Sequence, residues 1–319
     1  MRRRDFLAGS GATALTWPSP GKAQSTRVPT IGLLYLASHE PNNSLIRKGM
    51  ERLGYREGET IQYELRVADS SQTRLAEMAA DLVARKVDVI VAATTPAVLA
   101  AKAATSTIPI VMSPAADPVG SGIVASLSRP GGNITGGDAA LAELSATLLG
   151  YLREGLPSVT RMGLVLNSSD PFHRRLRESV EISNRIVAID LRIFEVPKPS
   201  DMEQVFDRMA SDGIGAAIVQ PTLPRQHGID LATQRKIATC SPVLGYAHQG
   251  GFMSYSGSAI DVSDIATAYI DRILKGAKPA DIPVRQPTQF DLVLNVKTAR
   301  SLGLTIPSLL LAKATDVIE

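Results

Sequence analysis

The sequence lacks the residues that most catalysts and metal sites need. It holds one cysteine, Cys240, which excludes a disulfide within the chain and a metal site of clustered cysteines. The four histidines are far apart in the sequence, at His39, His173, His227 and His248. No G-x-S-x-G elbow, H-E-x-x-H motif or P-loop occurs. These absences argue against an enzyme, a metal site or a bound cofactor.

The chain also lacks a basic surface for nucleic acid. Its 34 Lys and Arg against 31 Asp and Glu give a net charge of +3. Residues 1–23 carry all of this excess, so 30 basic and 30 acidic residues remain in the body. A short basic run at 173–177, HRRLR, is typical of the solvated face of a helix. We therefore expect no nucleic-acid partner.

Residues 1–23 predict an export signal. They have a charged start, a modestly apolar middle and a small-residue end near Ala23. Arg3 and Arg4, followed by Asp5, are similar to the twin-arginine export pattern of bacteria. The apolar middle is too short and too rich in glycine to span a bilayer. We expect cleavage near Ala23, a periplasmic protein and no permanent membrane anchor.

From Thr30 onward, short apolar strands alternate with amphipathic helices. The first series has expected strands at 30–36, 60–67, 87–93 and 108–113, with helices at 43–54, 73–86, from Pro96 onward and around 122–127. The second series has expected strands at 161–167, 190–196, 216–221, 242–247 and 291–295. Crossovers of helix length between strands require parallel sheets with helices on both faces. The sequence therefore predicts an α/β fold of two doubly wound lobes.

Pro- and Gly-rich segments predict where the chain passes between the lobes. Residues 129–137 and 250–258 are the expected crossings, and a strong helix at 262–276 follows the second of them. We expect an N-terminal lobe of 28–135 and 257–284, and a C-terminal lobe of 136–256 and 285–319. Several crossings side by side make a hinge.

The ends of the expected strands supply the candidate binding residues. Ligands of open α/β sheets bind beyond the carboxyl ends of the strands, near helix N-termini with free N–H groups. Thr94, Thr95 and Pro96 lie at such an end. Helix capping accounts for one threonine, which leaves the other for a ligand. Ser113 and Asp117 follow the next strand, and Asp117 either caps a helix or pairs with a ligand amine.

The second series offers an opposing wall of hydrogen-bonding and aromatic side chains at its own strand ends. They suit a small polar ligand with an apolar part, although each one is also a common turn residue. These residues are Asn167, Ser168, Gln220, Thr222, Tyr246 and His248.

Several long motifs carry a family resemblance over nearly the whole chain after the leader. They are DVIVA, IPIV followed by ADPVGSGIVASLSRPGGNITG, GGFMSY, and the C-terminal run from AYIDRILKGAKPADIPVRQ to TIPSLLLAKATDVIE. Together they resemble the ABC-transporter substrate-binding protein family with the type I periplasmic-binding fold, which includes tryptophan-binding members. The resemblance implies two lobes, joined by three crossings, that close on a small ligand. It implies ligand contacts at Ser38, Thr94–Pro96 and the turn from Ser113 through Ala115 to Asp117.

One departure from the family leaves the class of ligand open. Many relatives have an acidic residue shortly before the GG of the second crossing, where this chain has YAHQGG. We expect an exported monomer that captures an amino acid or an aromatic acid and delivers it to an inner-membrane permease with its ATPase. A periplasmic module that signals its bound state to a receptor is the alternative. An enzyme that uses the same cleft is a third reading.

Overall fold

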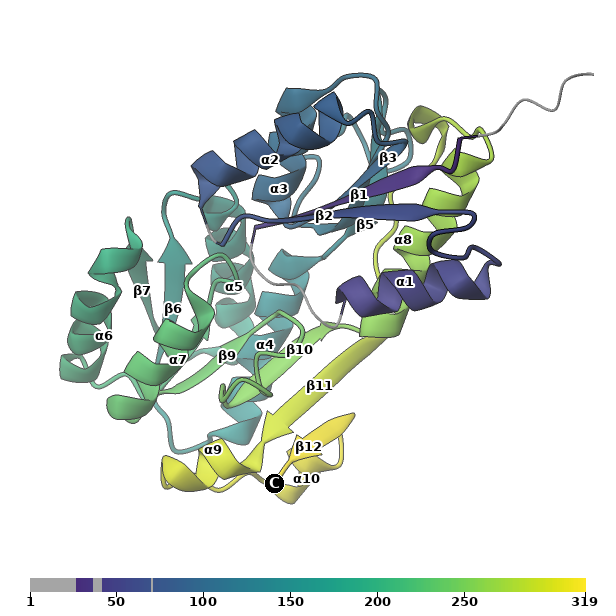
Figure 1. Cartoon of the computed structure of the whole chain (residues 1–319). Coiled ribbons are helices and arrows are strands. Elements are labelled where there is room, and N and C mark those ends of the chain that lie inside the picture. Colours follow the sequence, from purple (N-terminus) through teal and green to yellow (C-terminus); the bar gives the residue numbers. More distant parts are fainter. Residues whose placement is uncertain (1–26, 37–41, 70) are drawn as a thin grey trace, which may run out of the picture.

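Two α/β lobes make up the part of the chain that the computed structural model describes, which is residues 27–36, 42–69 and 71–319. Each lobe has one sheet of mostly parallel strands with helices on both faces (Figure 1). The predicted α/β class with two doubly wound lobes is confirmed. The predicted export signal and Ser38 lie outside the described residues.

The first lobe is built on a five-stranded parallel sheet of order β2-β1-β3-β4-β5. Its strands are β1 (Thr30–Tyr35), β2 (Gln62–Val67), β3 (Val89–Ala93), β4 (Ile110–Ala115) and β5 (Ile134–Asp138). Its helices are α1 (Asn42–Arg52), α2 (Gln72–Ala84), α3 (Thr95–Ala104) and α8 (Ala259–Leu274). Apolar side chains of α1 and α8 pack on one face of the sheet, and those of α2 and α3 pack on the other.

The second lobe has a seven-stranded sheet of order β12-β11-β10-β9-β8-β6-β7, in which only the β10–β11 pair is antiparallel. Its strands are β6 (Arg161–Asn167), β7 (Asp190–Val196), β8 (Ala216–Val219), β9 (Ala238–Ser241), β10 (Met253–Gly257), β11 (Phe290–Asn295) and β12 (Asp316–Ile318). Its α-helices are α4 (Leu141–Gly155), α5 (His173–Val187), α6 (Met202–Ser211), α7 (Arg225–Gln234), α9 (Val296–Ser301) and α10 (Ser308–Leu311). Two 3₁₀ turns, η1 (Pro199–Asp201) and η2 (Pro279–Asp281), complete the elements.

The helices follow from the spacing of apolar residues and from local caps. In α2, Leu75, Ala79 and Leu82 recur on one buried face, as an amphipathic helix requires. The side chain of Ser71 accepts a hydrogen bond from the Arg74 amide and caps the start of this helix.

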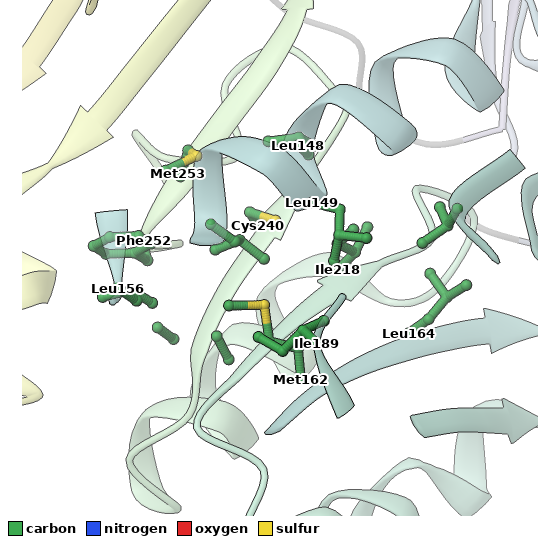
Figure 2. Close-up of a cluster of buried hydrophobic side chains, with 14 of the residues drawn as sticks. Leu148, Leu149, Leu156, Met162, Leu164, Ile189, Ile218, Cys240, Phe252 and Met253 are labelled. Atoms are coloured by element: carbon green, nitrogen blue, oxygen red, sulfur yellow. The ribbon is translucent and has the colours of Figure 1, made fainter. Parts of the chain in front are cut away.

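The largest core of the second lobe lies between its sheet and helices α4 and α5 (Figure 2). Leu148 and Leu149 of α4 belong to the same cluster as Ile218 of β8. Cys240 lies inside this cluster on β9 with no exposed surface.

The chain passes between the two sheets three times. The first passage, residues 139–140, joins β5 to α4, and the second is Ser258, between β10 and α8. The third passage, residues 285–289, leads back into β11. Segment 129–137, expected as the first crossing, instead contains β5, which pairs with β4, so the passage comes after Asp138. The exact lobe boundaries expected from the sequence stay a prediction.

Two local predictions are wrong. The strand expected at 242–247 is a series of turns, and the strand of that region is β9, four residues upstream. The helix expected around 122–127 is also a series of turns. There the amides of Ile123 and Val124 both bond to the carbonyl of Pro118, and Gly122 has a φ of 67°, which a helix does not contain. Within the described ranges, none of the helices has the length and apolar character needed to cross a membrane.

Candidate functional site

The two lobes meet where strands of the first sheet end and helices of the second lobe begin. Ala116, directly after β4, belongs to the same hydrophobic cluster as Ala142 and Phe172 of the second lobe. Beside this contact lies a small cavity of about 40 Å³. Its lining residues come from both lobes and are Asp117, Asp138, Leu141, Ala142, Glu143, Phe172 and Arg175. The strand ends that the sequence analysis selected in the first lobe therefore lie at a contact between the two lobes.

Thr94 lies at the amino end of α3 in a conformation that non-glycine residues rarely adopt. Its φ of 78° and ψ of 148° fall in a region populated almost only by glycine, which costs about 1–3 kcal/mol. Its buried hydroxyl has no hydrogen-bond partner among the described residues and does not cap the helix. Strain and an unpaired buried hydroxyl at one residue are both features that accumulate at ligand sites.

Thr95 has a different role from its neighbour. Its hydroxyl, in a side chain that is 4% exposed, donates to the carbonyl of Ala116 and accepts from the amide of Ala116, both at 3.0 Å. Pro96 occupies the first turn of α3, as the sequence predicts. Thr95 therefore joins α3 to the turn after β4, and its hydroxyl is already used in that contact.

Three further predicted residues lie at the end of β4 and in the turn after it, and Thr94 is bonded to this segment. The carbonyl of Pro114 accepts from the Thr94 amide at 2.9 Å, and Ser113, just before it, is buried. The buried Ala115 accepts from the amide of Ala139 at 2.7 Å, which ties the turn to the first passage. Asp117 has a φ of 42° and accepts from the Gly120 amide at 3.0 Å, so it stabilises a turn rather than a helix.

The predicted wall of the second lobe is a closed hydrogen-bond network around a buried aspartate. The amide nitrogen of Gln220 donates to Asp170 Oδ2 at 2.8 Å, and the hydroxyl of Thr222 donates to the same oxygen at 3.0 Å. The side-chain oxygen of Gln220 accepts from the backbone amide of Asn167, whose side chain donates to Thr222. Asp170 also accepts from the Phe172 amide, so this network fixes an aromatic ring that lines the cavity.

Tyr246 and His248 are not brought into this group by any contact of the described residues. Tyr246 is 1% exposed, and burial raises the pKa of its phenol. Gly251 lies so close that a Cβ there would be 2.3 Å from the tyrosine ring. His248 is exposed and lies 3.1 Å from the carboxylate of Asp316. Tyr246 therefore packs against the backbone of the turn at Gly251. His248 pairs with Asp316 of β12, at the edge of the second sheet.

Asp138 is a cavity residue that the sequence reasoning missed. It is the last residue of β5 and is 6% exposed. Burial is the main cause that raises the pKa of its carboxyl above the ordinary value, and the nearby charges of Glu143 and Asp117 add to this effect. The segment ITGGD would have indicated it, had β5 been predicted as a strand with Asp138 at its end. Among the described residues, no group of three or more His, Cys, Asp or Glu side chains could hold a metal ion.

Comparison with known proteins identifies the class. The family model described as ABC transporter substrate binding protein matches residues 37–318. The chain therefore belongs to the ABC transporter substrate-binding protein family, a family of binding proteins and not of enzymes. More distant solute-binding structures, 12% identical with TM-scores of 0.55 to 0.58, share the type I periplasmic-binding fold that the sequence predicts.

Three similar proteins each match about nine-tenths of this chain. A tyrosine-binding protein of Clostridioides difficile strain R20291 is 25% identical over 308 residues, which is 89% of this chain and 83% of that protein. The structure of an ABC domain from Streptococcus pneumoniae in complex with L-Trp is 27% identical, with a TM-score of 0.82 over 91% of this chain and 99% of that one. A conserved domain protein of Vibrio cholerae O1 biovar El Tor has 26% identity and the same TM-score over 91% of this chain and all of that one.

Proposed function

We propose that this protein is the exported binding component of an ABC importer and that it captures an amino acid with an aromatic side chain between its lobes. Membership of the substrate-binding family supports the role of binding component. The tyrosine-binding relative and the relative bound to L-Trp support the class of ligand. An inner-membrane permease with its ATPase is the proposed partner, and a monomer is the proposed form.

Thr94 is the observation that carries the proposal. A carboxylate placed at the amino end of α3 would accept hydrogen bonds from the Thr94 hydroxyl and from backbone amides of the first helical turn, in which Pro96 offers none. The helix dipole favours negative charge at the same place. The ligand would thus supply the partner that this buried hydroxyl lacks. The other predicted contacts, Ser38 among them, stay predictions.

The lobes must open to admit such a ligand. The cavity of about 40 Å³ has room for only a few water molecules. Sites for organic ligands are several times larger. We therefore propose that the three passages act as a hinge, and that the ligand enters an open form and is enclosed when the lobes close.

Calorimetric titration of the mature protein with tyrosine, tryptophan and the remaining amino acids tests the proposal. We expect saturable binding of an aromatic amino acid and a higher melting temperature with it, because a ligand of the folded state stabilises that state. The matched control is the amide of the same amino acid, which keeps the side chain and lacks the carboxylate, so it should bind weakly or not at all. Equal binding of acid and amide, or no binding of any amino acid, would reject the proposal.

Export is tested separately from binding. We expect the intact mass of the protein from the periplasmic fraction to lack residues 1 to about 23. A second sample, in which Arg3 and Arg4 are both replaced by Lys, tests the twin-arginine route and should stay in the cytoplasm with its leader attached. Processing of that variant at the normal level would point to the general secretory route.

A further inference from the structure

Asp138 occupies two positions at once, because it ends β5 beside the first passage and its side chain lines the cavity between the lobes. Its Oδ1 accepts from the amide of Ala140 at 3.1 Å, within that passage. The carboxylate therefore lies where the chain leaves the first lobe, and it faces the space that closure of the lobes encloses.

The same carboxylate holds the third passage. Its Oδ2 accepts from the side-chain amide of Gln286 at 2.9 Å. The backbone adds two bonds, from the Asp138 amide to the Arg285 carbonyl at 2.8 Å and from the Arg285 amide to the Gly136 carbonyl at 3.1 Å. The first and third passages are thus joined side by side, with Asp138 as the only side chain among the described residues that both bonds Gln286 and lines the cavity.

A second aspartate holds the third passage without facing the cavity. Asp261, in the first turn of α8, accepts from the backbone amides of Thr288 at 2.5 Å and Gln289 at 3.1 Å. It does not line the cavity. Asp261 therefore serves as a control for Asp138, because it bonds to the same passage but does not line the cavity between the lobes.

The cavity holds more negative than positive charge. Asp117, Asp138 and Glu143 face Arg175, whose guanidinium lies 3.6 Å from the carboxylate of Glu143. An ionised Asp138 in this place has lost most of its water and has two like charges nearby, which together outweigh its hydrogen bonds from Gln286 and Ala140. Its charge is tolerated better when the lobes open and water returns, or when a positive group enters the cavity.

We propose that Asp138 makes closure of the lobes depend on the charge inside the cavity: without a ligand the closed lobes hold Asp138 protonated, and the ammonium group of a bound amino acid takes the place of that proton. The part that concerns the ligand rests on the proposed function. It also distinguishes the two solutes that the sequence left open, because an amino acid brings an ammonium group and an aromatic acid without an amine does not.

The sign of the pH dependence follows from the direction of the pKa. Burial raises the pKa of Asp138 in the closed lobes, while the solvated carboxyl of open lobes keeps a value nearer the ordinary one. Between those two values the closed form binds more protons, so the ligand-free protein closes as the pH falls through this window. Binding of an amino acid releases the proton to the buffer, so affinity rises with pH there, by at most about tenfold per pH unit for one linked proton.

Three variants separate the effect of the charge on Asp138 from the effect of its hydrogen bond with Gln286 and from general effects on the hinge. Asp138→Asn removes the charge, and a rotated Gln286 amide can still bond to it. Gln286→Leu removes this hydrogen bond and keeps the charge on Asp138. Asp261→Asn alters the same passage away from the cavity. In small-angle scattering of ligand-free protein, we expect wild type and Asp261→Asn to become more compact as the pH falls. Asp138→Asn should not respond to pH, and Gln286→Leu should respond but be less compact throughout.

Proton release on binding provides the second measurement. Calorimetry with an aromatic amino acid, in two buffers of different ionisation enthalpy, should show proton release for wild type and none for Asp138→Asn. The deaminated analogue of the same amino acid should bind less tightly to wild type and release no proton. A pH response that persists in Asp138→Asn, or one that Asp261→Asn abolishes, overturns the proposal. If no amino acid binds, the proposed function fails while the scattering measurement still decides the role of Asp138.

Discussion

The hydroxyl of Thr95 is hydrogen-bonded to both backbone groups of Ala116, across the gap between α3 and the turn after β4. Because the hydrogen of this hydroxyl is already donated to the Ala116 carbonyl, Thr95 holds the turn in place. The Thr94 hydroxyl, which has no partner among the described residues, can instead donate to a ligand. Two adjacent threonines thus have separable effects on stability and on binding.

Replacing Thr94 by Val should weaken ligand binding and leave the fold intact. Valine has the same shape, and the lost hydrogen bond to a charged group is worth about 1.5–3 kcal/mol, or roughly tenfold to a hundredfold in affinity. The ligand-free protein loses no hydrogen bond in this change, so its melting temperature should not fall. Calorimetric titration and melting curves measure the two effects. Unchanged affinity would move the carboxylate site away from Thr94.

Thr94→Gly is the matched control for the backbone strain at this position. Glycine adopts a φ of 78° and a ψ of 148° readily, so the change should relieve part of the strain of about 1–3 kcal/mol. It also removes the hydroxyl, so affinity should fall as in Thr94→Val while the melting temperature rises. A melting temperature below that of Thr94→Val would show that this conformation is not strained.

Replacing Thr95 by Val should act mainly on stability. The change leaves the buried amide and carbonyl of Ala116 without the Thr95 hydroxyl, and each lost bond to a buried group costs about 1–3 kcal/mol. We expect a lower free energy of unfolding in urea, with affinity reduced only where the displaced turn disturbs Thr94. Wild-type stability in this variant would mean that water replaces the hydroxyl.

Asp170→Ala should destabilise the second lobe. It leaves the Thr222 hydroxyl and the Phe172 amide without this acceptor, each at a cost of about 1–3 kcal/mol, and removes one of the two acceptors of the Gln220 side-chain amide. Urea unfolding should show a clear loss of stability. Asp230→Ala is the control, because Asp230 is exposed and, among the described residues, its side chain bonds only to that of Gln226 four residues earlier. An equal effect of both changes would contradict the network.

Two glycines should respond in opposite directions to alanine. At Gly136, with a φ of 133°, a Cβ would lie 2.4 Å from the Met112 amide nitrogen in the neighbouring strand, so Gly136→Ala should prevent normal pairing of β4 and β5. At Gly150, within α4, a Cβ meets nothing within 4 Å, so Gly150→Ala should stabilise the protein by about 0.5–1 kcal/mol. Melting curves of both variants test the assignment.

The thiol of Cys240 should be unreactive in the native protein. Burial raises the pKa of this thiol, so it remains protonated at pH 8, and no surface of the residue is exposed. A thiol reagent should react with one group per chain in denaturant and with none in buffer. Rapid labelling of the folded protein would show that β9 opens on the timescale of the reaction.

The sequence predicted the fold class and most strands because buried parallel strands are continuous apolar runs, such as the five buried residues of β3. It missed β9 because ATCS is short and half polar, and its burial comes from α4 and the neighbouring strands. For the candidate site, reasoning from strand ends selected Thr94 and the turn after β4, whose contact with a ligand stays a prediction. It could not tell which of the two threonine hydroxyls is free, since that depends on a contact with Ala116, 21 residues away.

Asp138 and Asp170 escaped prediction for a related reason. Both are aspartates in turn-like surroundings, GGDAA and SSDPF, where a solvated side chain is the common outcome. Their burial is produced by segments far along the chain, Gln286 for Asp138 and Gln220 for Asp170. Local sequence cannot report such partners, because the fold alone brings them together.

The place of α8 in the first lobe has a consequence for how the chain folds during synthesis. This helix packs on α1, with Tyr55 bonded to Asp271 across 216 residues of sequence, and it covers one face of the first sheet. A nascent chain that ends before Ala259 therefore leaves part of that apolar face uncovered, and the second sheet still lacks β11 at this stage. Neither lobe can be completed before the other is largely made, so both should acquire stability late and together, at the end of translation.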